Sequence, residues 1–403
     1  MPQHVIRGGL GCLWAGLALA LAGAVALCPA ADWPVYRGPD HNGISSETGW
    51  LKDGAGVKVL WSAQVTTGCS SLSVADGRVY TMGNKADKDT VYCLDAATGR
   101  RIWKYSYACP LDKGLYEGGP NTTPTVDGGR VYTLSRRGYV LCLDAAKGTK
   151  VWGVKLAVKP PTWGLAGSPL VMGKMLLLNA GAAGTALDKD TGKVLWDSGS
   201  GPGGYSTPVP YPAGERTLLV LFGKRSVLAV RADDGKKVWE HPWKTSYDVN
   251  AGDPIVIDGG KKVFVSSGYN SGCALLDVSG AEPRELWRNK KMRNQRSCSV
   301  LYQGAIYGFD ESQLTCLDLA TGQEKWTQGG LGKASVIVAD GKLIVLAEKG
   351  KLVIAEATAA GFKELASGQV IRGKCWAAPV LAGGRIYARS KAGAVACAVL
   401  DGR

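Results

Sequence analysis

A short hairpin that ends in tryptophan recurs along this chain of 403 residues. In its clearest copy an apolar strand beginning at Cys93 ends at Asp95, the chain turns at Gly99, and a second strand ends at Trp103. A short hairpin loop needs a residue that tolerates a positive φ, and glycine is the usual one. The closing residues of the successive copies are Trp103, Trp152, Trp196, Trp239, Trp287, Trp326 and, in a degenerate copy, Leu365.

Each copy is preceded by another hairpin, which makes a unit of four short strands. Before the first copy, an apolar strand at 72–75 turns at Asp76 and Gly77 into a strand at 78–82. The units are spaced by about 40 to 50 residues, the period at which four-stranded repeats build the blades of a β-propeller. A β-sandwich or several small β domains would not explain such a uniform spacing.

The two ends of the chain complete the ring. Three strands at 376–381, 384–389 and 394–400 have no tryptophan-closed partner, and one isolated strand, ending at Trp61, begins at Val57. Pairing these strands closes the ring and removes exposed sheet edges. We therefore predict an all-β, eight-bladed propeller of four-stranded antiparallel blades. It occupies residues 56–403, follows an irregular segment at 31–55, and is closed by the N-terminal strand.

The first thirty residues have the pattern of a secretory signal peptide. Arg7 precedes an apolar run at 10–27, and Ala30 is a small residue at the expected cleavage site. Leu27 fits poorly before a lipidated Cys28, so cleavage is favoured over lipidation. No later segment approaches the roughly 20 apolar residues of a membrane span. The mature protein is expected to be periplasmic or extracellular.

The net charge indicates the kind of binding partner, and the number of cysteines bears on whether disulfide bonds form. Loss of residues 1–30 removes one charge, that of Arg7, and lowers the formal net charge from +14 to +13. Such an excess favours acidic partners. Nine of the 11 cysteines remain, and this odd number without regular spacing is not typical of a disulfide framework.

The hairpin closely resembles the tryptophan-docking motif of the pyrroloquinoline-quinone (PQQ) propeller repeat. The copies at 93–103, 142–152, 186–196 and 316–326 match well, whereas the copy at 229–239 has Arg231 in place of Asp. The leader that begins Trp33-Pro34 resembles the opening of exported PQQ-like repeat proteins of planctomycete-type bacteria. The resemblance implies the propeller fold and two functional branches. Quinoprotein dehydrogenases hold PQQ and Ca²⁺ over the axis, and BamB-like binding scaffolds hold neither.

Residues for catalysis are sparse. The resemblance implies that a dehydrogenase would have adjacent cysteines, oxygen ligands for Ca²⁺ and an aspartate base, but the chain has no Cys-Cys pair. Asp253 and Asp310, near blade loops, are the candidates for ligand or base, whereas most other acidic residues of the repeats are turn formers. With only His41 and His241 in the mature chain, a zinc site or a catalytic triad is nearly excluded. We therefore assign no catalytic residue, apart from Asp253 and Asp310 as alternatives.

Binding in propellers usually occurs at the channel mouth. We call the loops that enter each innermost strand lead-in loops, and those between second and third strands middle loops; both are expected at this mouth. The lead-in loops contain Trp163 and Tyr205 in one polar sector and Arg296, Lys333, Lys374 and Trp376 in the other. The middle loops add Lys85, Lys88, Arg136, Arg137, Lys224, Arg225, Lys349, Lys351, Arg389 and Lys391.

Converging cations near aromatic rings favour an acidic protein, an acidic polysaccharide or a small anionic ligand. Charged loop tips are also ordinary surface composition. Nucleic acid is disfavoured because the aromatic residues mostly close blades. The leading hypothesis is an exported, non-catalytic scaffold without a cofactor. The alternative is a PQQ- and Ca²⁺-dependent dehydrogenase that oxidises alcohols or sugars.

Overall fold

The computed structural model describes residues 31–111 and 118–402. The predicted signal peptide at 1–30 lies outside the described residues. Within those two ranges, no helix has both the length and the apolar character needed to cross a membrane.

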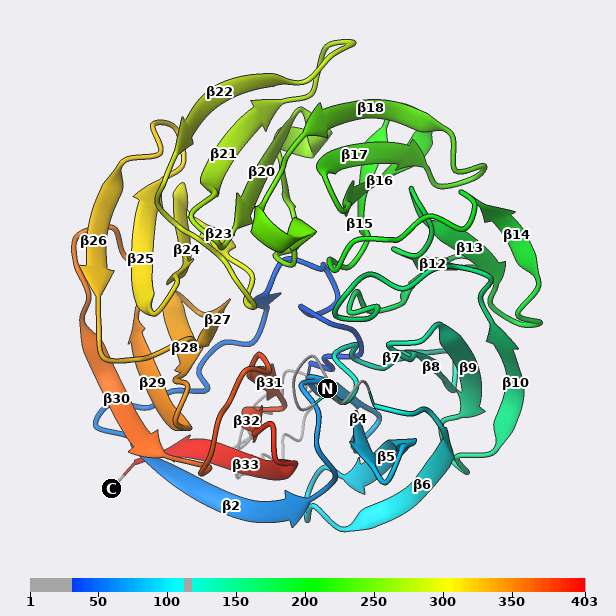
Figure 1. Ribbon diagram of the computed structural model, residues 1–403. Helices are drawn as coiled ribbons and strands as arrows, with labels where there is room; N and C mark the ends of the chain where they lie inside the picture. Colours follow the sequence, from blue (N-terminus) through cyan, green and yellow to red (C-terminus); the bar gives the residue numbers. More distant parts are fainter. Residues whose placement is uncertain (1–30, 112–117, 403) are drawn as a thin grey trace, which may run out of the picture.

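Eight sheets surround a central axis, and each contains an antiparallel blade of four strands (Figure 1). The sheet of blade seven has a fifth strand, the two-residue β1 (Ile44–Ser45), which is parallel to its neighbour. From the inside outwards, blades one to four consist of β3 (Ser73–Ala75), β4 (Arg78–Lys85), β5 (Lys88–Asp95) and β6 (Arg101–Ala108); β7 (Thr125–Asp127), β8 (Arg130–Leu134), β9 (Tyr139–Asp144) and β10 (Lys150–Lys155); β11 (Leu170–Met172), β12 (Met175–Leu178), β13 (Thr185–Asp188) and β14 (Val194–Asp197); and β15 (Val209–Ala213), β16 (Arg216–Phe222), β17 (Ser226–Arg231) and β18 (Lys237–Pro242).

Blades five to eight consist of β19 (Ile255–Ile257), β20 (Lys262–Ser267), β21 (Gly272–Asp277) and β22 (Arg284–Asn289); β23 (Val300–Tyr302), β24 (Ala305–Asp310), β25 (Gln313–Asp318) and β26 (Glu324–Gln328); β27 (Ser335–Ala339), β28 (Lys342–Leu346), β29 (Lys351–Glu356) and β30 (Glu364–Gln369); and β31 (Val380–Ala382), β32 (Arg385–Arg389), β33 (Ala394–Asp401) and β2 (Gly56–Gln64). Two single-turn 3-10 helices, η1 (Ser246–Asp248) and η2 (Asp258–Gly260), lie on either side of β19.

The predicted closure is confirmed. Strand β2 pairs antiparallel with β33 along its whole length, from Gly56 opposite Asp401 to Gln64 opposite Ala394. The innermost strand of this blade, β31, is shorter than the predicted strand at 376–381 and starts at Val380. Trp376 is therefore in a lead-in loop.

The tryptophans join neighbouring blades. The indole Nε1 of Trp103 donates a hydrogen bond of 2.9 Å to the carbonyl oxygen of Ala145 in blade two. Its ring covers Gly148, whose φ is 71°; a Cβ atom there would lie 2.5 Å from the indole. Glycine is thus required twice, for the left-handed backbone and for the close contact. The same arrangement pairs Trp61 with Gly99, Trp152 with Gly192, Trp196 with Gly235 and Trp287 with Gly322.

Three tryptophan positions depart from this pattern. Trp239 donates instead to the Tyr211 hydroxyl at 2.9 Å. Trp326 keeps the hydrogen bond to a backbone carbonyl, that of Thr358 at 2.8 Å, but its ring packs edge-on against Phe362 and not on a glycine.

In blade seven the sequence analysis assigned the closing position to Leu365, but the register gives it to Ala366, which pairs with Ile354; Leu365 lies in the bulge and is 38 % exposed. The two outer strands of blade eight, β33 and β2, come from opposite ends of the chain, so no hairpin turn joins them. A tryptophan at 366 would have no turn on which to dock.

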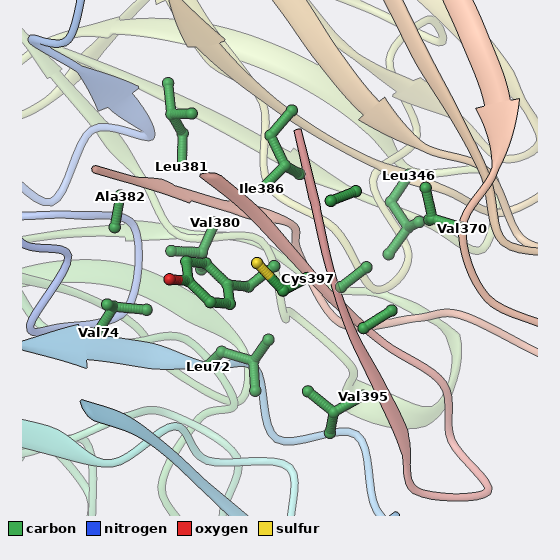
Figure 2. Close-up of a cluster of buried hydrophobic side chains, with 14 of the residues drawn as sticks. Leu72, Val74, Leu346, Val370, Val380, Leu381, Ala382, Ile386, Val395 and Cys397 are labelled. Carbon is green, nitrogen blue, oxygen red and sulfur yellow. The ribbon is translucent and has the colours of Figure 1, made fainter. Parts of the chain in front are cut away.

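The hydrophobic core lies between adjacent blades. Figure 2 shows side chains of blade eight, including Val380 and Ile386, packed between Leu72 and Val74 of blade one and Leu346 of blade seven. Cys397 belongs to this cluster and is fully buried. All nine cysteines of the described residues are unpaired, and most are small core side chains.

The leader segment lies inside the ring. The sequence predicted only that this segment is irregular, and Figure 1 shows it crossing the centre of the ring. Trp33 exchanges backbone hydrogen bonds with Val74 of β3, and the carbonyl of Gly43 accepts one from Val338 of β27 at 2.9 Å. Two residues, β1 (Ile44–Ser45), then run parallel to β27. The leader contacts several innermost strands, so it fills part of the channel.

Candidate functional site at the channel mouth

Lead-in and middle loops meet at one end of the ring, as predicted. The backbone N–H of Lys391, in a middle loop, donates a hydrogen bond of 2.7 Å to the carbonyl of Lys374, in a lead-in loop. The N–H of Cys375 donates one of the same length to the carbonyl of Glu348, in the middle loop of blade seven. These bonds hold the loops of blades seven and eight side by side.

Cations surround one indole ring at this mouth. The guanidinium carbon of Arg296 lies 3.6 Å from the centre of the Trp376 ring, and the ammonium groups of Lys374 and Lys391 lie 4.8 and 5.2 Å from it. We call these four residues the Trp376 cluster. The Trp376 Nε1 donates to Glu348 at 3.2 Å. Within residues 31–111 and 118–402, neither Arg296 nor Lys374 forms an ion pair.

The thiol of Cys69 shows that these charges converge. Burial raises the pKa of Cys69, while Arg389, Lys391, Arg296 and Lys374 all act to lower it. The four cations come from blades six and eight, so the ring fold brings them around one point. Arg389 is fully buried, and burial lowers the pKa of its guanidinium to about 10. It donates to the carbonyl oxygens of Ser70 and Thr66 at 3.1 and 2.9 Å, which is a structural role.

Lys333 lies beside the cluster, but its charge is shared. Its ammonium group is 3.3 Å from Glu311 and hydrogen-bonds to the Gln295 side chain. Lys333, Glu311, Arg296 and Trp376 line one small pocket. Lys333 therefore lies at the predicted site, but Glu311 partly neutralises its charge.

Several middle-loop cations are paired elsewhere. Lys224 and Arg225 bind the Asp248 carboxylate at 3.2 and 2.9 Å. Arg137 donates to the carbonyl of Pro110 at 2.9 Å, and Lys351 pairs with Glu364 at 3.6 Å. Sequence reasoning overestimated the basic face because it could not assign these partners. The part that converges is smaller and centred on Trp376.

The aromatic residues of the other sector also come together. The backbone N–H of Trp163 donates to the Tyr205 hydroxyl at 3.3 Å. Burial raises the pKa of Tyr205, and the nearby Tyr269 adds to this rise. Tyr269 in turn packs edge-on against Tyr247, with ring centres 5.4 Å apart. Sequence reasoning missed Tyr247 and Tyr269, although the lead-in and middle loops of blade five contain them.

Tyr247 is the most exposed of these rings. It is 72 % exposed and has a φ of 69°, and Tyr269 has a φ of 55°. Left-handed backbone is uncommon for aromatic residues. The neighbouring Asp248 is held by Lys224 and Arg225, which fixes the turn that presents Tyr247.

The leader contributes one half of a buried charge pair. Arg37 Nε lies 3.9 Å from Asp253 Oδ2, and both side chains are at most 5 % exposed. The backbone N–H of Thr207 donates to Asp253 at 2.7 Å. Burial raises the pKa of Asp253 to about 6, while Arg37 acts in the opposite direction. This pair joins the leader to the lead-in loop of blade five.

The Asp310 carboxylate is also bound by an arginine. Its carboxylate accepts hydrogen bonds of 2.9 Å from the Arg293 backbone N–H and from Arg293 Nη2. A calcium ion prefers six to eight oxygen ligands. No group of three or more His, Cys, Asp or Glu side chains suited to a metal occurs among the described residues. Asp253 and Asp310 each face an arginine, so these two carboxylates do not fit a shared Ca²⁺ site.

The ring of eight blades and its docked tryptophans define a PQQ-like β-propeller repeat protein. The family described as outer membrane protein assembly factor BamB matches residues 52–112 and 87–328, which is more than half of the chain. The chain therefore belongs to this family. No curated protein sequence matches it significantly.

Solved structures show the same fold. BamB from Moraxella catarrhalis is 16 % identical with a TM-score of 0.64, over 85 % of this chain and 100 % of that one. The quinohemoprotein alcohol dehydrogenase from Comamonas testosteroni is 15 % identical with a TM-score of 0.70, over 92 % and 81 %. A europium-containing methanol dehydrogenase is 14 % identical with a TM-score of 0.66, over 89 % and 88 %. At these identities the likeness concerns the fold alone.

Proposed function

We propose that this protein is an exported, non-catalytic scaffold that binds an acidic ligand or protein partner at the channel mouth. The Trp376 cluster is the observation that supports the proposal. Three cations crowd one ring, and two of them, Arg296 and Lys374, lack an ion pair among the described residues. The negative face of the ring attracts each cation. The cations still repel one another, and a bound carboxylate or phosphate would relieve that repulsion.

The export part of the proposal rests on the predicted signal peptide, and the scaffold would then act in the periplasm or outside the cell. A rigid ring with a basic mouth suits a scaffold, because the blades hold the loops without needing a ligand. The acidic partner is a protein, a polysaccharide or a small anion.

The second candidate is a PQQ- and Ca²⁺-dependent dehydrogenase, favoured by the likeness of the fold to alcohol and methanol dehydrogenases. Two observations favour the scaffold instead. The leader fills part of the channel, and the two candidate carboxylates are bound by arginines.

Charge reversal tests the proposal. We expect the double variant Arg296→Glu/Lys374→Glu to lose binding to poly-L-glutamate and to oligogalacturonate, measured by titration calorimetry. The matched control is Lys147→Glu/Lys193→Glu, which changes net charge equally at exposed hairpin turns on the opposite end of the ring. An equal loss of binding in both double variants would mean that binding depends on the net charge of the protein and not on the Trp376 cluster. Dye-coupled alcohol oxidation after addition of PQQ and Ca²⁺ would support the dehydrogenase.

A further inference from the structure

We propose that the mouth binds an acidic polysaccharide whose sugar rings pack on Tyr247 and Tyr269 while its carboxylates bind at the Trp376 cluster. This inference rests on the proposed function and names the class of ligand. It depends on the way the two tyrosines are presented and on their continuity with the cations.

The presentation of Tyr247 has no evident structural benefit. Its ring is 72 % exposed, so it buries little apolar area on folding. Its left-handed backbone is unfavourable for a residue with a side chain, and such conformations persist only where neighbouring contacts impose them. Those contacts are present, because Arg225 and Lys224 bind Asp248 and the Thr245 hydroxyl donates to the carbonyl of Val249 at 3.0 Å. The fold thus holds an aromatic ring outwards.

Tyr247 also differs in position from the other exposed apolar side chains. Among the described residues, the remaining large ones lie on outermost strands at the rim of the ring: Val59, Leu60, Ile102, Val151, Val194, Leu195, Val238, Leu286 and Leu365. The tyrosine pair instead lies in the loops of blade five: η1, which carries Tyr247, is in the lead-in loop, and Tyr269 is in the middle loop. The exposed apolar surface at the mouth is therefore aromatic.

The aromatic surface continues directly into the cations. Gly268, next to Tyr269, packs against Gln295, next to Arg296; a Cβ on Gly268 would lie 3.0 Å from the Gln295 Cα. The loop that carries Tyr269 thus packs against the loop that carries Arg296, whose guanidinium lies over the Trp376 ring. A chain bound on the tyrosines would cross these two packed loops to meet the cations. Figure 1 shows blades five and six adjacent in the ring.

Sugar chemistry matches this pairing of surfaces. A pyranose ring presents a face of C–H groups that packs on an aromatic ring, while its hydroxyls remain in water. Uronic acids add one carboxylate to each ring, and arginine and lysine bind carboxylates. An acidic protein would instead be expected to use a desolvated apolar centre. A few tyrosines and a cluster of cations suit a linear acidic glycan better.

The test compares three probes with the purified protein: oligogalacturonate, a neutral oligogalactoside of equal length, and poly-L-glutamate. We expect Tyr247→Ala/Tyr269→Ala to weaken oligogalacturonate binding by about tenfold or more, because two aromatic contacts with the sugar rings are lost. Poly-L-glutamate binding should not change. Tyr247→Phe should retain oligogalacturonate binding because the ring remains, and this variant controls for folding of the loop.

The outcomes separate this inference from the proposed function. If oligogalacturonate binds the tyrosine double variant as tightly as the native protein, the polysaccharide assignment is wrong. The same holds if poly-L-glutamate binds and oligogalacturonate does not, which would leave an acidic protein as the partner. If neither polyanion binds, the proposed function fails as well. If the neutral oligogalactoside bound as tightly as oligogalacturonate, the cations would take no part in recognition and the assignment of an acidic polysaccharide would be wrong.

Discussion

The indole nitrogen of Trp61 lies 3.1 Å from the carbonyl oxygen of Ala96, and this hydrogen bond joins the N-terminal strand of blade eight to blade one. Two separate contacts therefore close the ring at the same place. Strand β2 completes blade eight through its pairing with β33, and Trp61 then docks that blade on its neighbour.

Removal of the closing strand should open the ring. We expect deletion of residues 56–62 to lower the melting temperature sharply, because blade eight loses most of its outer strand and its docking tryptophan. Trp61→Ala alone should destabilise by about 3–5 kcal/mol, the usual effect of truncating a large buried aromatic side chain. Thermal unfolding measures the first effect and urea unfolding the second. Leu60→Ala, at a half-exposed neighbour, should change stability little; equal effects at 60 and 61 would contradict the docking role.

The docking glycine provides a second test. Gly148→Ala introduces a Cβ that would lie 2.5 Å from the Trp103 ring and forces alanine into a φ of 71°. Gly128→Ala is the matched control, since Gly128 also has a positive φ but no atom within 4 Å of its Cβ position. The control should lower the unfolding free energy by about 1 kcal/mol, through the backbone strain alone, and Gly148→Ala should lower it distinctly more. Equal losses of unfolding free energy would mean that the tryptophan contact contributes nothing.

The Arg37–Asp253 pair should make stability depend on pH. Burial raises the pKa of Asp253 from 3.8 to about 6 in the folded state, so between these values the folded state binds more protons than the unfolded one. This carboxyl therefore stabilises the fold below pH 3.8, and that contribution is lost as pH rises to about 6. The total is about 3 kcal/mol by linkage. The check is the difference in urea stability between native protein and Asp253→Asn at several pH values. A constant difference would contradict the shift.

The cations of the mouth should not be equivalent. Lys374 has no ion pair among the described residues, whereas Lys333 lies 3.3 Å from Glu311. We expect Lys374→Ala to weaken binding of poly-L-glutamate more than Lys333→Ala does, because Glu311 already offsets the charge of Lys333. Binding should also weaken with added salt. Titrations of both variants at two ionic strengths measure the effect, and a larger loss from Lys333→Ala would reverse the assignment.

Most of the fold could be predicted because it is repeated. The spacing from Trp103 to Trp326 carries the blade period, and the unpartnered strand ending at Trp61 identifies the closure. The site could be predicted only in part. Trp376 and Arg296 were identified as neighbours through their lead-in loops, but Lys224 and Arg225 were included although they bind Asp248. Pairing between loops of different blades has no local signal in the sequence.

The sequence by itself determined the number of blades, the hairpin turns and the way in which the ring closes, since these depend on periodicity and on residues close together in the chain. Only the tertiary structure decided that the leader enters the channel, that Arg37 meets Asp253, and that three cations surround Trp376. The physical reason is that these contacts join segments from different blades, and their geometry exists only once the ring has closed.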